Sequence, residues 1–209
     1  ARKAEEYFRA HAGDWESLRD LHVETTQLDA ALTRLLGNTP VDALLDIGTA
    51  TGHVLKQLSH LAQEAVGIDI SREMLSVARS NLDKSDYPNV QVRYADMYKL
   101  PFADGGFDLI TIHMVLHFAE DPEDVLREAA RVLKPGGRLV IVDFEPHSLD
   151  SLRDQHAHRW LGFAPEKINH LLAEVGLVAE APVRLEGDPL TVSIWPASRA
   201  ANDSRQAAS

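Results

Sequence analysis

Three aspartates stand directly after three successive apolar segments, and their order suggests nucleoside chemistry. Asp46 follows "ALL", Asp69 follows "VGI" and Asp96 follows "VRYA". If these segments are neighbouring parallel strands, ligands bind beyond their carboxyl ends, and an acid after the second strand accepts hydrogen bonds from ribose hydroxyls. A carboxylate beside Met97 suits adenine, because the acid accepts from the amino group and the thioether covers the ring. One such acid alone is more often a helix cap, but the three together predict an adenosine site.

The turn "DIGTATG", from Asp46 to Gly52, indicates the rest of the ligand. Gly48 and Gly52 permit a tight turn and a close approach of the backbone, and the following helix offers unpaired N–H groups. A nicotinamide dinucleotide site would require the pattern G-x-G-x-x-G, which fails at Ala50 and His53. Asp46 would repel pyrophosphate and attract a cation such as an ammonium group. We therefore expect adenosine joined to an amino acid, without phosphate.

The backbone conformation of Ala50 determines how well this turn works. With a negative φ its methyl group costs little. With a positive φ, alanine adds strain of about a kcal/mol or more, and ligand affinity should then suffer.

Histidines are the candidate acid–base groups. The chain has 10 of them and no cysteine, and imidazole is the natural base near neutral pH. His117 is the first candidate catalytic residue because it follows the fourth predicted strand, and His156 and Arg159 in "HAHRWLGF" come next. For each histidine, a partly buried ring bonded to a backbone carbonyl is the commoner situation. We predict no metal site, because His156 and His158 are two residues apart and would point in different directions on a helix.

Alternating strands and helices are expected to position these side chains. Short apolar, β-branched runs predict strands, and apolar residues at helical spacing predict helices. Repeated strand–helix units imply a mostly parallel sheet with helices on both faces. We predict a Rossmann-like α/β fold of seven strands that ends in a C-terminal antiparallel hairpin. The strands are expected at 43–48, 64–70, 90–96, 107–113, 138–144, 177–187 and 190–198, and the main helices at 3–36, 53–63, 71–82, 121–133 and 165–176.

The chain is expected to divide into three parts. Residues 1–40 would form an N-terminal helical lid, in which Trp15 and His22 close over the ligand or pack on the sheet. Residues 41–198 would form the main α/β domain. Residues 199–209 are small and polar, and we expect a disordered tail.

Composition narrows the class of protein. The net charge of −11 over 209 residues and the lack of Lys/Arg clusters argue against binding of nucleic acid by this domain itself. No apolar run is long enough to cross a bilayer, and no secretory signal is visible, so a cytoplasmic location fits. The opening "ARKAEEYF" lacks Met, and we expect a trimmed piece of a longer chain.

Four segments together resemble the class I S-adenosylmethionine-dependent methyltransferases. They are "LLDIGTATG", "VGIDIS", "ADMYKLPFADGGFDLITIHMVLHF" and "LREAARVLKPGGRLVIVDF", and they occur in the family's order within residues 44–144. "LPFADGGFD" and "RVLKPGG" resemble the small-molecule branch that includes quinone-biosynthesis enzymes. "YFRAHAGDWESLRDLHV" and "HAHRWLGF" resemble methyltransferase domains fused behind arsenic-repressor-type winged-helix regulators of bacteria. The resemblance implies S-adenosylmethionine as cofactor and S-adenosylhomocysteine as product.

The resemblance also implies a role for each matched residue. Asp46 would lie near the methionine ammonium group, Asp69 would accept from the ribose hydroxyls, and Asp96 would accept from the adenine amino group. The family usually has glycine where Ala50 stands, which bears on cofactor affinity and not on the fold. The expected cofactor contacts are Asp46, Gly48, Thr49, Ala50, Gly52, Asp69, Ile70, Met74, Asp96, Met97 and His113.

Two functions follow from the resemblance. The first is methyl transfer to a small-molecule acceptor, aromatic or quinol-like, by in-line displacement at the sulfonium methyl group. Arsenite methylation is disfavoured, because arsenic methyltransferases rely on cysteines. The second is a sensor domain that binds S-adenosylmethionine or S-adenosylhomocysteine and regulates a fused winged-helix DNA-binding domain, which Ala50 and the fusion-type resemblance favour. We expect no membrane span, and a homodimer is consistent with either function.

Overall fold

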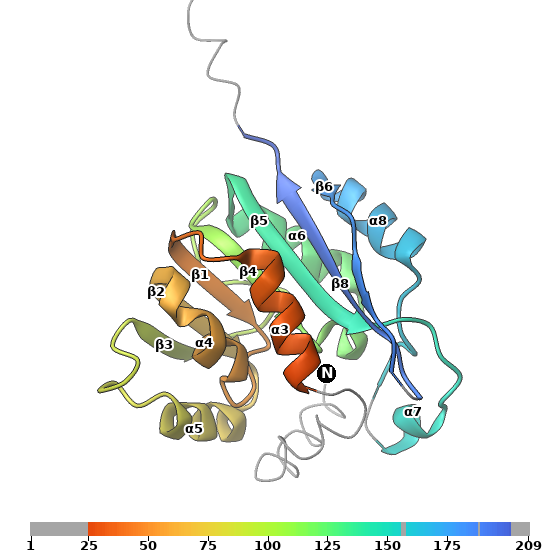
Figure 1. Ribbon diagram of the computed structural model, residues 1–209, viewed down its shortest axis with the longest axis horizontal. Coiled ribbons are helices and arrows are strands. Elements are labelled where there is room, and N and C mark those ends of the chain that lie inside the picture. Colours follow the sequence, from red (N-terminus) through yellow and green to blue (C-terminus); the bar gives the residue numbers. More distant parts are fainter. Residues whose placement is uncertain (1–24, 156–157, 188, 202–209) are drawn as a thin grey trace, which may run out of the picture.

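An eight-stranded sheet forms the centre of the protein in the computed structural model (Figure 1). The structure describes residues 25–155, 158–187 and 189–201. The strand order is β3-β2-β1-β4-β5-β8-β6, with β7 also paired to β8. The strands are β1 (Val41–Ile47), β2 (Ala62–Asp69), β3 (Val90–Tyr94), β4 (Phe107–His113), β5 (Leu133–Phe144), β6 (Leu177–Ala179), β7 (Val183–Leu185) and β8 (Val192–Arg199). β1 to β5 run parallel, which confirms the α/β fold that the sequence predicts.

The C-terminal hairpin differs from the prediction in its first strand. We expected one strand over 177–187, but the structure has two short strands, β6 and β7, that both pair antiparallel with β8. The break spans Glu180 to Pro182. Proline has no N–H to donate to a ladder and is confined to edges and breaks of a sheet. The sheet therefore has eight strands where seven were expected.

Helices cover both faces of the sheet. α3 (Thr25–Leu36), α4 (His53–Leu58) and α5 (Arg72–Asn81) share an apolar cluster with Leu44 on one face, and the short α7 (Ser151–Gln155) contributes to the same cluster. α6 (Pro122–Val132) and α8 (Pro165–Glu174) pack on the other face, against Leu45 and Ile47. Leu44 and Leu45 face opposite layers because side chains alternate along a strand.

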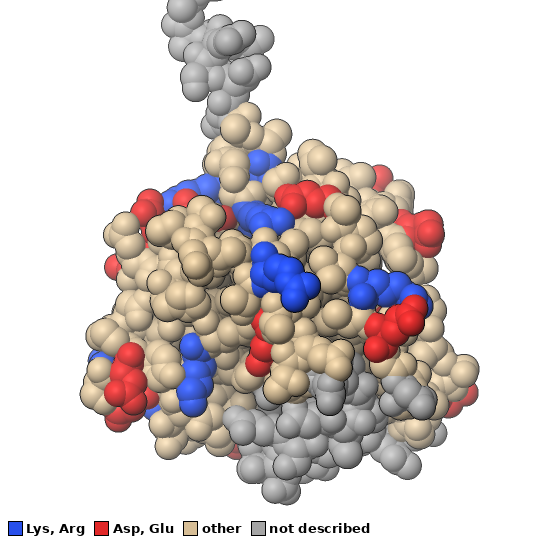
Figure 2. Space-filling model, in the orientation of Figure 1, with Lys and Arg blue, Asp and Glu red and all other residues tan. Residues whose placement is uncertain are grey.

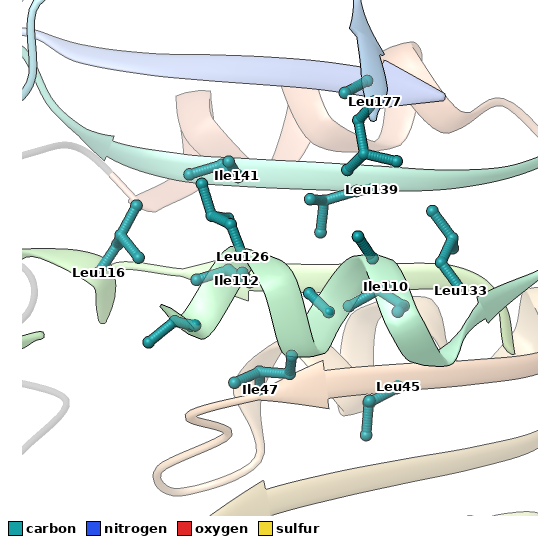
Figure 3. Close-up of a cluster of buried hydrophobic side chains, with 14 of the residues drawn as sticks. Leu45, Ile47, Ile110, Ile112, Leu116, Leu126, Leu133, Leu139, Ile141 and Leu177 are labelled. Carbon is teal, nitrogen blue, oxygen red and sulfur yellow. The ribbon is translucent and has the colours of Figure 1, made fainter. Parts of the chain in front are cut away.

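The second of these layers shows how α6 is held (Figure 3). Leu126 of α6 lies against Ile110 and Ile112 of β4 and Ile141 of β5, in one buried cluster. All four side chains are fully buried, and each such burial contributes about 1.5–3 kcal/mol. Because the strands are fixed by this packing, the loops at their carboxyl ends start from a rigid edge.

Side-chain caps and short turns set the ends of the helices. The Asp121 carboxylate accepts two N–H groups of the first turn of α6, those of Glu123 and Asp124, and Pro122 occupies the first position of the helix. Ser71 caps α5 in the same way. α4 ends at Leu58, earlier than the helix expected over 53–63, because the 3-10 turn η1 (Ser59–Leu61) leads directly into β2.

The N-terminal segment is described only from α3 onward. Its expected lid residues, Trp15 and His22, lie outside the described residues, as do His156 and the end of the tail. The division into parts at residues 40 and 198 therefore stays a prediction. Among the described helices, none has the length and apolar character needed to cross a membrane.

We predict that Asp121→Ala lowers the free energy of unfolding by about 1 kcal/mol, because two N–H groups of α6 lose their acceptor. Asp121→Asn is the matched control: asparagine caps nearly as well and should cost only a few tenths of a kcal/mol. Urea denaturation compares the two variants with wild type. Equal losses in both variants would contradict the capping role.

Candidate cofactor and active site

A cavity opens where β1, β2, β3 and β4 end, at the carboxyl edge of the sheet. The glycine turn after β1 forms one wall, and the segment after β4 forms another. Gly52, although expected as a contact, does not line the cavity. The expected cofactor contacts that do line it are Asp46, Gly48, Thr49, Ala50, Asp69, Ile70, Met74, Asp96, Met97 and His113.

Asp46 places a buried carboxylate in the cavity wall. Asp46 is only 1% exposed. The hydroxyl of Thr111, a residue of β4, donates to Asp46 Oδ1 at 2.7 Å. Burial raises the pKa of Asp46 to about 6, while the hydroxyls of Thr111 and Thr49 act in the opposite direction. The Thr49 hydroxyl lies near the carboxylate without making a hydrogen bond of normal geometry, and Oδ2 has no hydrogen-bond partner within the described part of the chain. A buried carboxylate oxygen without a donor is costly, so this atom suits a ligand that brings an ammonium group.

The glycine turn is pinned to the end of β2. The N–H groups of Gly48 and Thr49 both donate to the carbonyl of Ile68 at 2.9 Å. φ is +75° at Gly48 and +86° at Gly52, values that disfavour any side chain. A Cβ on Gly48 would also lie 2.6 Å from Val115. The absence of a side chain at Gly48 therefore lets the backbone of the turn lie directly at the cavity.

Ala50 adopts a left-handed conformation, with φ of +47°. This answers the question that the sequence leaves open: the position is strained for alanine, and glycine would fit it better. The Ala50 N–H donates to Asp69 Oδ2 at 2.9 Å. Met114, another cavity residue, has φ of +55°. Two strained residues therefore face one cavity, where such strain commonly gathers.

Asp69 joins the first two turns around the cavity. Besides the bond from Ala50, its Oδ1 accepts the Ser71 N–H at 2.8 Å. Burial raises its pKa, while the backbone N–H groups of Ser71, Ala50 and Ile70 act in the opposite direction. Each carboxylate oxygen has a second acceptor site, so Asp69 can still accept two hydroxyl groups. Asp96 is exposed, and its Oδ1 accepts the Tyr98 N–H at 3.0 Å.

His117 lies behind the cavity wall and does not line the cavity. It is 2% exposed, and its Nδ1 donates to Asp143 Oδ1 at 2.8 Å. Its backbone N–H donates to Asp143 Oδ2 at 3.1 Å. The imidazole ring lies 4.1 Å from the ring of Phe118, which does line the cavity. A direct catalytic role for His117 therefore stays a prediction.

The three expected catalytic residues are not brought together. Arg159 is largely exposed, does not line the cavity, and pairs with Glu120 at 3.6 Å. Its backbone N–H donates to the carbonyl of His117 at 3.0 Å. His156 lies outside the described residues. In the part of the chain that the structure describes, no three His, Cys, Asp or Glu residues are grouped to hold a metal ion.

Sequence reasoning missed several residues at the site. Asp143 is the second-last residue of β5, as Asp46 is of β1, so the same rule would have found it. His53, the first residue of α4, lines the cavity, and so do Tyr98 and Glu120, which are joined because the Glu120 N–H donates to the Tyr98 hydroxyl at 2.6 Å. The sequence carries no signal for this contact, because it joins two loops that follow different strands.

A sheet of this order, with a glycine turn after β1 and an acid after β2, is the nucleotide-binding arrangement of Rossmann-like folds. The family model described as "Methyltransferase domain" matches residues 45–141. The chain is 32% identical over 207 residues to the ubiquinone/menaquinone biosynthesis C-methyltransferase UbiE of Azotobacter vinelandii. The aligned region covers 92% of this chain and 79% of that protein. This chain belongs to the S-adenosylmethionine-dependent methyltransferase family, and the resemblance stated from the sequence is confirmed.

Two further comparisons are consistent with this family. The chain is 31% identical over 175 residues to an arsenite methyltransferase of Aquipseudomonas alcaligenes, covering 74% of this chain and 51% of that protein. The N-methyltransferase NodS of Bradyrhizobium japonicum, crystallised with S-adenosylhomocysteine, superposes with a TM-score of 0.77 at 20% identity, covering 94% of this chain and 98% of that chain. The protein is an S-adenosylmethionine-dependent methyltransferase.

We predict that Ala50→Gly raises the free energy of unfolding by about 0.5–1 kcal/mol, because glycine relieves the left-handed strain but loses more chain entropy on folding. Ala78→Gly, inside the helix α5, is the control and should be destabilising. Chemical denaturation of both variants measures the difference. A loss of stability in Ala50→Gly similar to that in Ala78→Gly would contradict the assigned strain.

Asp46 should also make stability depend on pH. Its pKa is raised in the folded protein from 3.8 to about 6, so ionisation opposes folding. The cost is absent below about pH 4, develops as the pH rises, and is complete above about pH 6, where it reaches about 3 kcal/mol. Asp46→Asn cannot ionise and should gain stability relative to wild type as the pH rises from 4 to 7.5. A stability difference that stays constant across this range would contradict the raised pKa.

Proposed function

We propose that this methyltransferase binds its cofactor through Asp46, Asp69 and Asp96 and methylates a small aromatic or quinol-like acceptor. The observation that carries the proposal is the buried Oδ2 of Asp46, which lies at the cavity and has no hydrogen-bond donor among the described residues. The ammonium group of a methionine moiety would supply that donor and balance the charge. Asp69 would accept the ribose hydroxyls, and Asp96 with Met97 would hold the adenine.

The residues present fit S-adenosylmethionine in their chemistry as well as in their order. The sulfonium of the bound cofactor supplies an already activated methyl group. The protein therefore has mainly to orient the two reactants and exclude water. Gly48 would let the cofactor approach the backbone closely. Asp46 would hold the amino-acid part of the cofactor, and Asp69 would hold its ribose. Asp69 is already held in place by Ala50 and Ser71, so no rearrangement of its carboxylate is needed on binding.

An apolar acceptor suits the wall that follows β4. Met114, Val115 and Phe118 line this side of the cavity, and Glu120 lines it as an exposed acidic residue. The relative named as a quinone C-methyltransferase supports an aromatic acceptor. The relative named as an arsenite methyltransferase does not lead us to propose arsenite, because this sequence contains no cysteine to bind arsenic as a thiolate.

His117 is proposed as a positioning residue for this acceptor-side wall. Asp143 holds both its ring and its backbone N–H, and its carbonyl accepts the N–H groups of Arg159 and Trp160, both at 3.0 Å. Because the ring packs against Phe118, these bonds fix a side chain that lines the cavity. A role of His117 as general base would require the acceptor to reach the His117 ring past Phe118. We therefore propose the positioning role and not the general-base role.

The alternative of a sensor domain has no support from the comparisons, and the three relatives and neighbours described above are named as methyltransferases. A fused winged-helix domain and a homodimer remain expectations from the sequence alone. On the face covered by α3, basic and acidic side chains of the described residues are interspersed (Figure 2). Together with the net charge of −11, this favours a small-molecule partner over a nucleic acid.

We predict that Asp69→Asn weakens the binding of S-adenosylmethionine by roughly 10- to 100-fold, because hydrogen bonds to a charged acceptor are lost. Calorimetric titration measures the affinity, and the exposed Asp83→Asn is the control, with no expected change. Unchanged affinity in Asp69→Asn would overturn the site assignment.

A second assay follows S-adenosylhomocysteine formation with a reduced naphthoquinone that lacks a ring methyl group. Normal cofactor binding without product would exclude this acceptor class.

A further inference from the structure

We propose that His53, held by Asp29 of α3, binds the carboxylate of the cofactor's amino-acid part. Asp46 and His53 would then recognise the two opposite charges of one amino-acid group. The inference rests on the proposed function and deepens it. It adds a specificity residue and brings the N-terminal helix into cofactor recognition.

His53 and Asp46 line the same cavity. His53 is the first residue of α4, directly after the glycine turn. The two side chains are close enough for His53 to lower the pKa of Asp46 through its charge. An amino acid carries its ammonium and carboxylate groups on one carbon atom. A site for it therefore needs an acceptor and a donor in one cavity, and Asp46 and His53 both line this one.

The composition of the cavity wall favours His53 as the carboxylate ligand. Four acids line the cavity, Asp46, Asp69, Asp96 and Glu120, and the described lining contains no Lys or Arg. Histidines are therefore the side chains of the described lining that can carry positive charge. His113 is the other one, at the end of β4, but His53 is the histidine whose ring is held by Asp29, an acid that does not itself line the cavity.

Asp29 fixes which nitrogen of His53 is available. Nε2 lies 2.9 Å and 3.0 Å from the two carboxylate oxygens of Asp29. An ionised carboxylate can only accept, so Nε2 carries a hydrogen, and Nδ1 donates to a second carboxylate when the ring is protonated at both nitrogens. The Asp29 side chain is itself mostly buried, with 28% exposed. An acid behind a ligand-binding imidazole orients the ring.

The same contact couples α3 to the cofactor. The Gln57 side chain of α4 donates to the carbonyl of Asp29 at 2.7 Å and to the Thr33 hydroxyl at 2.9 Å. α3 is thus attached to α4 along one turn, with His53 at the cavity end of the contact. A ligand that holds His53 would also hold α3, which is the described part of the expected lid.

The test compares two ligands on matched variants by calorimetry. S-adenosylhomocysteine carries the carboxylate, and its decarboxylated analogue, S-adenosyl-3-thiopropylamine, keeps the adenosine and the ammonium group. We expect wild type to prefer S-adenosylhomocysteine by about tenfold or more, as for a charge-assisted bond. In His53→Gln this preference should fall to about twofold or less, while affinity for the analogue changes little. Lys56→Gln, an exposed cation one turn further along α4, should leave the preference unchanged.

The outcomes separate this inference from the proposed function. An unchanged preference in His53→Gln overturns the carboxylate role. Equal weakening of both ligands also overturns it, because His53 would then act only through the shape of the turn. Wild type that binds neither ligand would overturn the cofactor site itself, and the inference with it. If His53→Gln does not fold, Asp29→Asn makes the same comparison, and a preference equal to that of wild type contradicts the proposal.

Discussion

The carboxylate of Asp69 holds the cavity together. It accepts one N–H from the turn after β1 and one from the turn after its own strand, so two loops that could move independently share one acceptor. The glycine turn depends on this bond, because Ala50 is in a strained conformation that the bond helps to retain. The start of α5 depends on it as well, since Ser71 is both a donor to Asp69 and the cap of that helix. A group that would bind the ribose therefore also builds the site.

The second constraint is the burial of Asp46. Its carboxylate lies at the end of a central strand, with one oxygen bonded to Thr111 and the other lacking a donor. Such a group opposes folding when it is ionised, and a bound cation removes that cost. If the cofactor's ammonium group binds Oδ2 as proposed, cofactor binding and stability are linked through one atom. This explains why a phosphate-free ligand with an ammonium group fits the turn, whereas a dinucleotide does not.

Much of this site could be read from the sequence, because strand ends and glycine turns leave local signals. Asp46, Asp69 and Asp96 follow apolar runs, and parallel strands must bring their carboxyl ends to one edge. The parallel direction of the central strands follows from the alternation of strands and helices. The conformation of Ala50 could be posed as a question but not answered, since φ depends on what the neighbouring turn requires.

The remaining features depend on contacts between distant segments. His117 was expected at the cavity, and only the packing of Phe118 in front of it and Asp143 beside it shows that it lies one layer behind. The contact between His53 and Asp29 joins two residues that are 24 positions apart in the sequence, and no pattern in either helix predicts it. Pro182 lies within the strand expected over 177–187, but its consequence, two short strands paired with β8, required the register of the sheet.

A crystal structure of the protein with S-adenosylhomocysteine would test the central claim most directly. We expect both ribose hydroxyls to lie within hydrogen-bond distance of the Asp69 carboxylate, about 2.6–3.2 Å. We also expect the ammonium group to lie at the same distance from Oδ2 of Asp46. A ligand bound with its ribose on other residues, or with its ammonium group turned away from Asp46, would contradict the account.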